Sequence, residues 1–428
     1  MEATMTQKYF YAIKGVVAAL IIIPVLCMIS PLYGIAEEIR YPVPCYEGKN
    51  LKKVRAWEKT WAGKKIDHTN VDGVKEYMPD SWYEVHKNAD VWGKNSFTIV
   101  PYKQIKIAPS QVEWTLKQAG KTYIDDNDYL QNQVAGTAFT KPTTGIEVMY
   151  NFDTKPTIDE RQQLMDDMYL YDHRRKSARK FGADVHVLKM AERSAIAPMP
   201  ELPTNPRGLL QGSLVFYIAP PELKGTIMLD NQYKDRSREW DGWMWIAALR
   251  RVRRQDTTQR QDHRFGMDFC SDDQNGWFGR VARNKYKLLR RHDILMGRHN
   301  IPQDIYFEKG TFLWQGTTRE RINTYVVETV SKDPQYLYSK MIFWIDPETW
   351  FILYSDKYDR QGRLWKINSY CLASYTSKDG IQYSEKCTNL HADIQRKHAT
   401  LARGLDKDLT GVYDITHYTP AELNRIGE

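Results

Sequence analysis

Short apolar runs separated by turn sequences dominate the second half of the chain. Residues 346–348 (Asp-Pro-Glu) and 378–380 (Lys-Asp-Gly) are typical of the turns, and the runs between such turns have the length of β-strands. Strands that follow one another without long helices pair antiparallel. The expected strands are residues 214–218, 225–232, 240–252, 325–330, 336–345, 350–358, 364–375 and 381–390.

Several of these strands are apolar at consecutive positions, as in residues 243–249 and 341–345. A sheet with one face in water would alternate apolar and polar residues more regularly. Two interpretations follow: either both faces of the sheet are covered, or the sheet curves around an apolar cavity.

The first half of the chain has a mixed pattern. Apolar residues at spacings of three and four predict a helix from residue 51, and Asn70 predicts a second short helix that Pro79 ends. Thr157 and Glu160 form a capping-box pattern, which predicts a third helix. With the strands above, this gives a mainly β fold with accessory helices.

Composition excludes two classes of protein. Of the 428 residues, 42% are hydrophobic and 27% are charged, and the mean hydropathy is −0.60. These values exclude a globally disordered chain and a membrane protein with many spans.

The N-terminus has the pattern of a secretory signal. Residues 15–36 carry no charge and follow Lys8 and Lys14, and the small residue Ala36 precedes an expected cut at Glu37. The expected location is therefore the periplasm. The alternative is an uncleaved anchor in the inner membrane, because the uncharged run is nearly long enough to span a bilayer.

This pattern divides the chain into three expected parts. They are a signal peptide at residues 1–36, a helical and mixed part at residues 37–205, and an antiparallel β part at residues 206–428.

Four cysteines remain after the expected cleavage, namely Cys45, Cys270, Cys371 and Cys387. A three-residue hairpin loop at 378–380 places residues whose numbers sum to 758 opposite each other, and Cys371 and Cys387 meet that condition. Oxidising conditions outside the cytoplasm favour a disulfide between them. The alternative is two buried thiols, because a shift of one residue in register would separate them.

Basic residues concentrate between residues 250 and 298, where 13 Lys and Arg accompany six Asp. Such a cluster attracts anionic lipid head groups or an acidic partner, and nucleic acid is not expected in the periplasm. The alternative is a charged strand edge that resists unwanted pairing. The candidate contact residues are Arg250, Arg251, Arg253 and Arg254.

The chain lacks the common patterns for a nucleophile, a metal or a phosphate. Gly-x-Ser-x-Gly, His-Glu-x-x-His, Cys-x-x-Cys, phosphate-loop and dinucleotide motifs are all absent from the sequence. Asp272 and Asp273 are adjacent carboxylates, but the sequence Asp-Asp-Gln-Asn-Gly favours a turn. We therefore expect no enzyme, no cofactor and no metal site.

Three stretches carry distinctive motifs. They are residues 57–92, with Trp-Ala-Gly-Lys-Lys-Ile at 61–66, residues 205–278, with Pro-Glu-Leu-Lys-Gly at 221–225, and residues 343–366, with Phe-Trp-Ile-Asp at 343–346. In this order they resemble the proteobacterial domain-of-unknown-function 1329 (DUF1329) family. The usual pattern of that family at residues 268–273 is Asp-Phe-Thr-x-x-Asp, and Cys270 departs from its Thr.

The central and C-terminal stretches are also similar to outer-membrane lipoprotein-sorting proteins of the LolA type. That resemblance implies a strongly curved antiparallel sheet, an incomplete β-barrel closed by helices, around an apolar cavity for acyl chains. It implies a carrier that transfers a lipid or other hydrophobic molecule between envelope components, with an inner-membrane transporter or an outer-membrane protein as candidate partners. The alternative is a scaffold subunit of an envelope complex whose cavity is filled by its own side chains.

If the sheet encloses a cavity, large side chains of its central strands are the candidates to line it. Size and strand position select Phe216, Met228, Trp243, Trp245 and Phe343. A single sequence does not specify which face of each strand is concave.

Overall fold

The computed structural model describes residues 40–408, 411 and 413–428. The expected signal peptide at residues 1–36 lies outside this part of the chain. The described residues belong to one unit.

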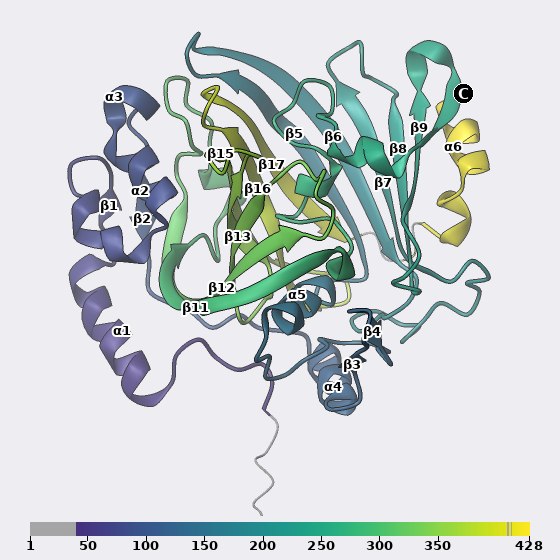
Figure 1. Ribbon diagram of the computed structural model, residues 1–428, viewed down its shortest axis with the longest axis horizontal. Helices are drawn as coiled ribbons and strands as arrows, with labels where there is room; N and C mark the ends of the chain where they lie inside the picture. Colours follow the sequence, from purple (N-terminus) through teal and green to yellow (C-terminus); the bar gives the residue numbers. More distant parts are fainter. Residues whose placement is uncertain (1–39, 409–410, 412) are drawn as a thin grey trace, which may run out of the picture. The chain divides into compact units, whose positions relative to one another are not determined.

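A large curved sheet runs through this unit (Figure 1). Its strands are β1 (Lys65–Ile66), β2 (Phe97–Ile99), β5 (Glu160–Asp172), β6 (Ser177–Lys189), β7 (Leu209–Ala219), β8 (Ile227–Tyr233), β9 (Asp241–Ile246), β10 (Arg251–Gln255), β11 (Asn284–Met296), β12 (Thr318–Ser331), β13 (Lys340–Ile345), β14 (Ile352–Tyr358), β15 (Leu364–Thr376), β16 (Gln382–Asp393) and β17 (His398–Asp408).

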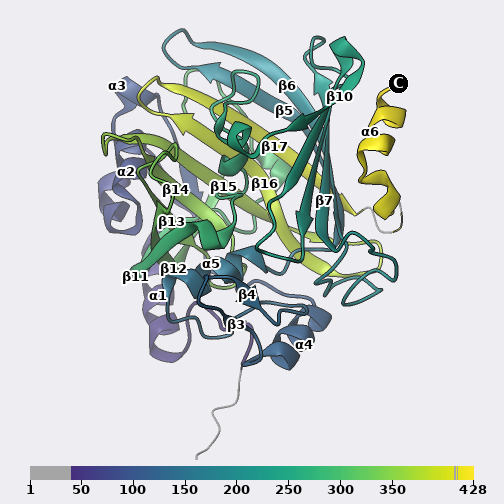
Figure 2. The ribbon, with the colours of Figure 1, turned by 45° about the vertical axis from the view of Figure 1, so that its right-hand side comes forward.

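Within the described residues the strand order is β1-β2-β12-β13-β14-β15-β16-β17-β5-β6-β7-β8-β9-β10, and β11 pairs with β12. Strands β12 and β2 are parallel, and the other pairs from β12 to β10 are antiparallel. The sheet does not close into a barrel, so β10 and β11 lie at opposite sides of it (Figure 2). A mainly β fold with a strongly curved antiparallel sheet is therefore confirmed.

The helices of the described chain are α1 (Gly48–Trp61), α2 (Asp80–Lys87), α3 (Ala89–Trp92), α4 (Pro109–Gln118), α5 (Gly145–Asp153) and α6 (Pro420–Gly427), with the short hairpin β3 (Tyr123–Ile124) and β4 (Leu130–Gln131) after α4. Helices α1 to α3 and α6 cover one face of the sheet, which we call the outer face. Helices α1 to α3 lie along one flank and α6 along the opposite flank in Figure 1. We call the other face of the sheet, which α6 and α1 to α3 leave uncovered, the concave face.

The strand predictions for the second half of the chain are largely confirmed, but residues 240–252 form two strands. The 3-10 turn Ala247–Leu249 separates β9 from β10, and Arg250 adopts left-handed backbone geometry with φ of 47°. This turn folds β10 back against β9, so that Arg254 lies opposite Trp243. An unbroken apolar pattern in the sequence conceals the turn.

The third helix expected from Thr157 and Glu160 is wrong, because the chain enters strand β5 at Glu160. The Glu160 carboxylate accepts a hydrogen bond of 2.7 Å from the buried Arg193 guanidinium. Pairing of β5 with β6 and β17 outweighs the local capping signal. The sheet therefore crosses the expected boundary between residues 205 and 206.

The expected disulfide is also absent, since Cys45, Cys270, Cys371 and Cys387 are free thiols. The hairpin has the expected register at its end, with Leu372 opposite Lys386. A β-bulge then shifts the pairing by one residue and places Cys371 opposite Thr388. Cys387 is the extra residue of the bulge, and its thiol lies 3.4 Å from the Cys371 carbonyl oxygen.

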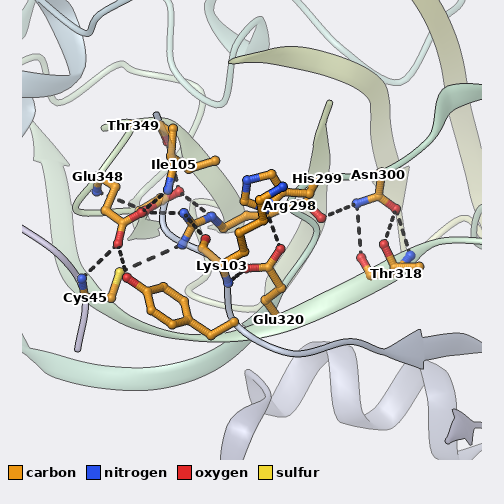
Figure 3. Close-up of polar contacts among 12 residues, drawn as sticks. Cys45, Lys103, Ile105, Arg298, His299, Asn300, Thr318, Glu320, Glu348 and Thr349 are labelled. Carbon is orange, nitrogen blue, oxygen red and sulfur yellow. Dashed lines mark hydrogen bonds and ion pairs between the residues drawn. The ribbon is translucent and has the colours of Figure 1, made fainter. Parts of the chain in front are cut away.

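The buried carboxylate of Glu348, in the turn between β13 and β14, binds both Arg298 and the N-terminal segment (Figure 3). Glu348 Oε2 lies 2.5 Å from Arg298 Nη2, and both side chains are fully buried. The same carboxylate accepts hydrogen bonds from the backbone N–H groups of Cys45 and Ile105, each at 2.8 Å, and from the Tyr102 hydroxyl at 2.6 Å. Burial opposes ionisation, but Arg298 and these donors keep the pKa of Glu348 below its usual range.

The tryptophans of β9 provide a test of the outer core. Trp245 is 1% exposed in a cluster with Leu423 of α6, so Trp245→Ala is expected to cost about 3–5 kcal/mol in the free energy of unfolding. Trp243 shares this face but is only partly buried, so the matched change Trp243→Ala is expected to cost less. Chemical denaturation measures both values, and equal losses would contradict this assignment.

A candidate binding groove on the concave face

The connection between the two sheet edges determines the concave face. Residues 256–283, which we call the crossing segment, leave β10 and lead into β11. Because β10 pairs with β9 and β11 pairs with β12, this segment runs from one edge of the sheet to the other. It therefore covers the opening of the incomplete barrel.

A groove with a volume of about 120 Å³ lies between the crossing segment and the concave face. Strands β5, β6, β7, β16 and β17 form one wall of the groove, and Phe269 and Phe278 of the crossing segment contribute to the other. The apolar lining residues of the strands are Met165, Met168, Ala183, Val185, Val187, Val215, Tyr217 and Ala402.

Strand register explains this lining. Val185 pairs with Val215, and Ala183 pairs with Tyr217, so these side chains share the concave face. Their immediate neighbour Phe216 belongs to the outer cluster beneath α6. The small side chains of Ala183, Val185 and Val215 leave space on the concave face, whereas Phe216 packs into the outer cluster.

A buried carboxylate anchors the middle of the crossing segment. Asp273 Oδ1 lies 2.5 Å from Lys357 Nζ on β14, and Asp273 Oδ2 lies 3.4 Å from Lys366 Nζ on β15. The Tyr338 hydroxyl donates to Asp273 at 2.8 Å. Burial alone would raise the pKa of Asp273, but the two ammonium groups hold it well below its usual range.

A second carboxylate anchors the segment to β17. Asp268 Oδ1 lies 2.8 Å from His398 Nδ1, and the Thr400 hydroxyl donates to Asp268 Oδ2 at 2.9 Å. The hydrogen bond to Asp268 raises the pKa of His398. This contribution to stability is fully present below the pKa of an unfolded histidine and is lost as pH rises through the raised pKa.

The five predicted cavity residues are distributed over both faces. Phe216, Trp243 and Trp245 belong to the outer cluster beneath α6, so their assignment to the groove is wrong. Met228 lies on the concave side, where the Tyr217 hydroxyl contacts its sulfur at 3.7 Å. Phe343 is fully buried in a separate core beneath α5.

The predicted arginine cluster lies at an edge of the sheet. Arg251 and Arg253 are exposed on β10, and Arg254 forms an ion pair of 2.5 Å with Asp241. The other basic residues of the region are dispersed. Arg298, for example, is fully buried in the centre around Glu348.

Sequence reasoning interpreted Asp272 and Asp273 only as part of a turn and so missed the role of the crossing segment. Both lie in the short 3-10 turn Ser271–Asp273, yet both are buried. The resemblance to the family contained the relevant signal, because its motif around Cys270 includes the position of Asp273.

The described thiols are not activated as nucleophiles. Burial raises the pKa of Cys45, Cys270, Cys371 and Cys387, which disfavours the thiolate that a nucleophile requires. No group of three or more His, Cys, Asp or Glu side chains between residues 40 and 408, or in the described C-terminal residues, is arranged to hold a metal ion.

A family model described as a protein of unknown function, DUF1329, matches residues 65–423. An uncharacterized protein of Pseudomonas aeruginosa is 23% identical over 402 residues, which cover 85% of this chain and 81% of that protein. A DUF1329 family protein from Desulfovibrio piger has a solved structure that matches at 15% identity and a TM-score of 0.46, over 65% of this chain and 96% of its own. A LolA superfamily protein from Nitrosomonas europaea matches at 14% identity and a TM-score of 0.39, over 65% of this chain and 98% of its own.

Removal of the Asp273 charge tests the anchor. Asp273→Asn leaves the buried ammonium groups of Lys357 and Lys366 without their carboxylate and is expected to cost about 3–5 kcal/mol in the free energy of unfolding. The control is Asp262→Asn, an exposed position of the same segment, with an expected change within about 0.5 kcal/mol. Urea denaturation measures both, and a similar stability of the two variants would refute the anchoring role.

Proposed function

This chain belongs to the DUF1329 family, whose function is unknown, and we propose that it binds a lipid or similarly hydrophobic molecule in the groove beneath the crossing segment. The observation that carries the proposal is the apolar lining of a groove between a curved sheet and a separate covering segment. The proposed role is transfer of that molecule between envelope components in the periplasm. It involves no chemical reaction.

The hydrophobic effect provides the driving force. Half-buried Val185 and Val215 leave apolar surface in the groove, and an acyl chain carries apolar surface of its own. Burial of apolar surface is favourable by about 25 cal/mol per Å². Contact between the chain and the groove would therefore shield both surfaces from water.

The crossing segment must move before a ligand of ordinary size can enter. The groove volume of about 120 Å³ is smaller than the ~300–1,000 Å³ of typical small-molecule sites. Phe269 and Phe278 form the covering wall, and their displacement would enlarge the groove. The anchors at Asp268 and Asp273 would keep the segment attached to the sheet.

The small volume also favours the second candidate function, a scaffold subunit whose concave face is filled by its own side chains. Part of this face is already filled, because Phe343 and Trp277 lie in a core with α5. Direct ligand binding separates the two functions.

The proposed location rests on the signal pattern of residues 1–36, outside the described residues. None of the helices between residue 40 and the C-terminus that the structure describes has the length and apolar character needed to cross a membrane.

We further propose that Arg250, Arg251, Arg253 and Arg254 contact an anionic membrane surface or an acidic partner during transfer. The exposure of Arg251 and Arg253 on an edge strand supports this contact. The same exposure also fits the alternative, in which the charges prevent other strands from pairing with this edge.

Two adjacent residues of β7 separate carrier from scaffold. Val215→Asp places a charge in the groove and is expected to lower the affinity for a fluorescent fatty acid at least about tenfold, with little change in the melting temperature. Phe216→Asp places the same charge in the outer core and is expected to cost about 3 kcal/mol in stability.

Fluorescence titration and melting curves measure the two effects, and Ile218→Asp at a 40% exposed position of the same strand is the control. Wild-type protein that binds no fatty acid, together with a Val215→Asp variant that unfolds, would favour the scaffold.

Charge reversal tests the edge arginines. The double change Arg251→Glu and Arg253→Glu is expected to reduce binding to vesicles that contain anionic lipid. It should also make the remaining binding less sensitive to salt, because salt weakens the attraction between exposed opposite charges, which is screened beyond about 8 Å at physiological ionic strength. The melting temperature should remain close to that of the wild type, since both side chains are exposed. Unchanged vesicle binding would support the role in edge protection.

A further inference from the structure

The apolar groove continues into a smaller recess of different chemistry. The recess has a volume of about 70 Å³, and it shares Arg161, Val187 and Lys386 with the groove. Its other lining residues include Asp153, Lys155 and Glu385. We call this recess the basic chamber.

Cations outnumber carboxylates among the described side chains that line the chamber. The three cations are Lys155, Arg161 and Lys386, and the two carboxylates are Asp153 and Glu385. Glu385 lies 3.4 Å from Arg161 Nε and 3.7 Å from Lys386 Nζ, so it is shared between two cations.

Asp153 does not pair with the cations of the chamber. Its carboxylate lies 3.2 Å from Arg236 Nε instead. The Arg236 guanidinium in turn bonds both oxygens of Glu192, at 2.8 and 3.0 Å. Asp153 is therefore part of a separate ion-pair network at the wall of the chamber.

Lys155 is the unusual member of the chamber. Its ammonium donates to the Phe152 carbonyl at 2.9 Å and lies 4.1 Å from the centre of the Phe152 ring. Among the described residues, no carboxylate lies within ion-pair distance of it. Burial, with a further contribution from Lys386, lowers the pKa of Lys155 to about 7.

A buried ammonium without a carboxylate is costly, and an anionic oxygen would offset that cost by a charge-assisted hydrogen bond. We propose that the basic chamber holds the anionic head group, a carboxylate or a phosphate, of an amphiphile whose apolar chain lies in the groove. This inference rests on the proposed function and specifies the class of ligand. The shared wall at Arg161 and Lys386 places head group and chain in one continuous site.

The wider recess of about 570 Å³ on the other side of Trp277 is a poorer match to such a ligand. Arg280 in its lining donates to backbone carbonyls, but Arg260 and Arg283 already form ion pairs with Asp272 and Glu239, at 2.9 and 2.5 Å. It also shares no lining residue with the apolar groove.

Matched ligands test the head group. We expect the wild-type protein to bind dodecanoate and dodecyl phosphate at least about tenfold more tightly than dodecanol, measured by displacement of a fluorescent fatty acid. Lys155→Met should remove most of this preference without weakening dodecanol binding, since it replaces a buried charge by an apolar side chain of similar length. Lys285→Met, at an exposed position of β11, is the control and should behave as the wild type.

The pH dependence gives a second measurement that needs no variant. Dodecanoate binding should weaken as pH rises from 6 to 8.5, because Lys155 loses its proton near pH 7, whereas dodecanol binding should stay constant. The other charged groups that face Lys155 are Lys386, Asp153, Glu385 and Lys189.

Each outcome has a separate meaning. Equal affinity for dodecanoate and dodecanol in the wild type would overturn the inference and leave the proposed function intact. Failure of all three chain-bearing ligands to bind would overturn the proposed function itself. Displacement of dodecanoate by inorganic phosphate or acetate at comparable concentrations would show a site for free anions and also overturn the inference.

Discussion

The fold depends on the attachment of a covering segment to a sheet that does not close. Edge strands β10 and β11 leave the concave face open, and residues 256–283 cross this opening. A surface loop would be free to leave the sheet, but Asp273 is buried between Lys357 and Lys366. Because the Asp273 carboxylate serves two ammonium groups in one dry site, its removal leaves both cations without their buried counter-charge. The crossing segment is therefore an integral part of the barrel wall.

The two faces of the sheet perform different tasks. On the outer face, large side chains such as Trp245 pack against α6 and contribute stability. On the concave face, Ala183, Val185 and Val215 are too small to reach the crossing segment at every point, and a groove remains. Close packing is the rule in protein interiors, so the unfilled space on the concave face is where the proposed ligand would lie.

Polar chemistry is distributed along the groove in a way that suits an amphiphile. Apolar residues such as Val185 and Val215 line the groove together with polar ones, and the chamber with Lys155 adjoins it at Arg161 and Lys386. The anchors at Asp268 and Asp273 lie on the crossing segment, outside this chamber. A ligand could therefore displace the aromatic cover near Phe269 while the segment stays fastened at its carboxylates.

The sequence alone determined the class of the fold. Strands 364–375 and 381–390 and the register at Leu372 and Lys386 followed from turn chemistry and alternation, which act between near neighbours. The family was also identifiable, because its motifs survive in order along the chain. Each turn, alternation pattern or motif involves only a few neighbouring residues, so the sequence alone is enough to detect it.

Tertiary structure decided which face of each strand is concave and which carboxylates are buried. Phe216 and Val215 are adjacent residues of one strand and so point to opposite faces, but only the position of α6 and of the crossing segment decides that Val215 faces the groove. Thr157 and Glu160 satisfy a helix signal, yet distant strands recruit the segment into the sheet. Asp273 acquires its role from lysines 84 and 93 residues away. These properties depend on contacts between residues that are distant in the sequence. Such contacts form, and contribute to stability, only in the folded chain.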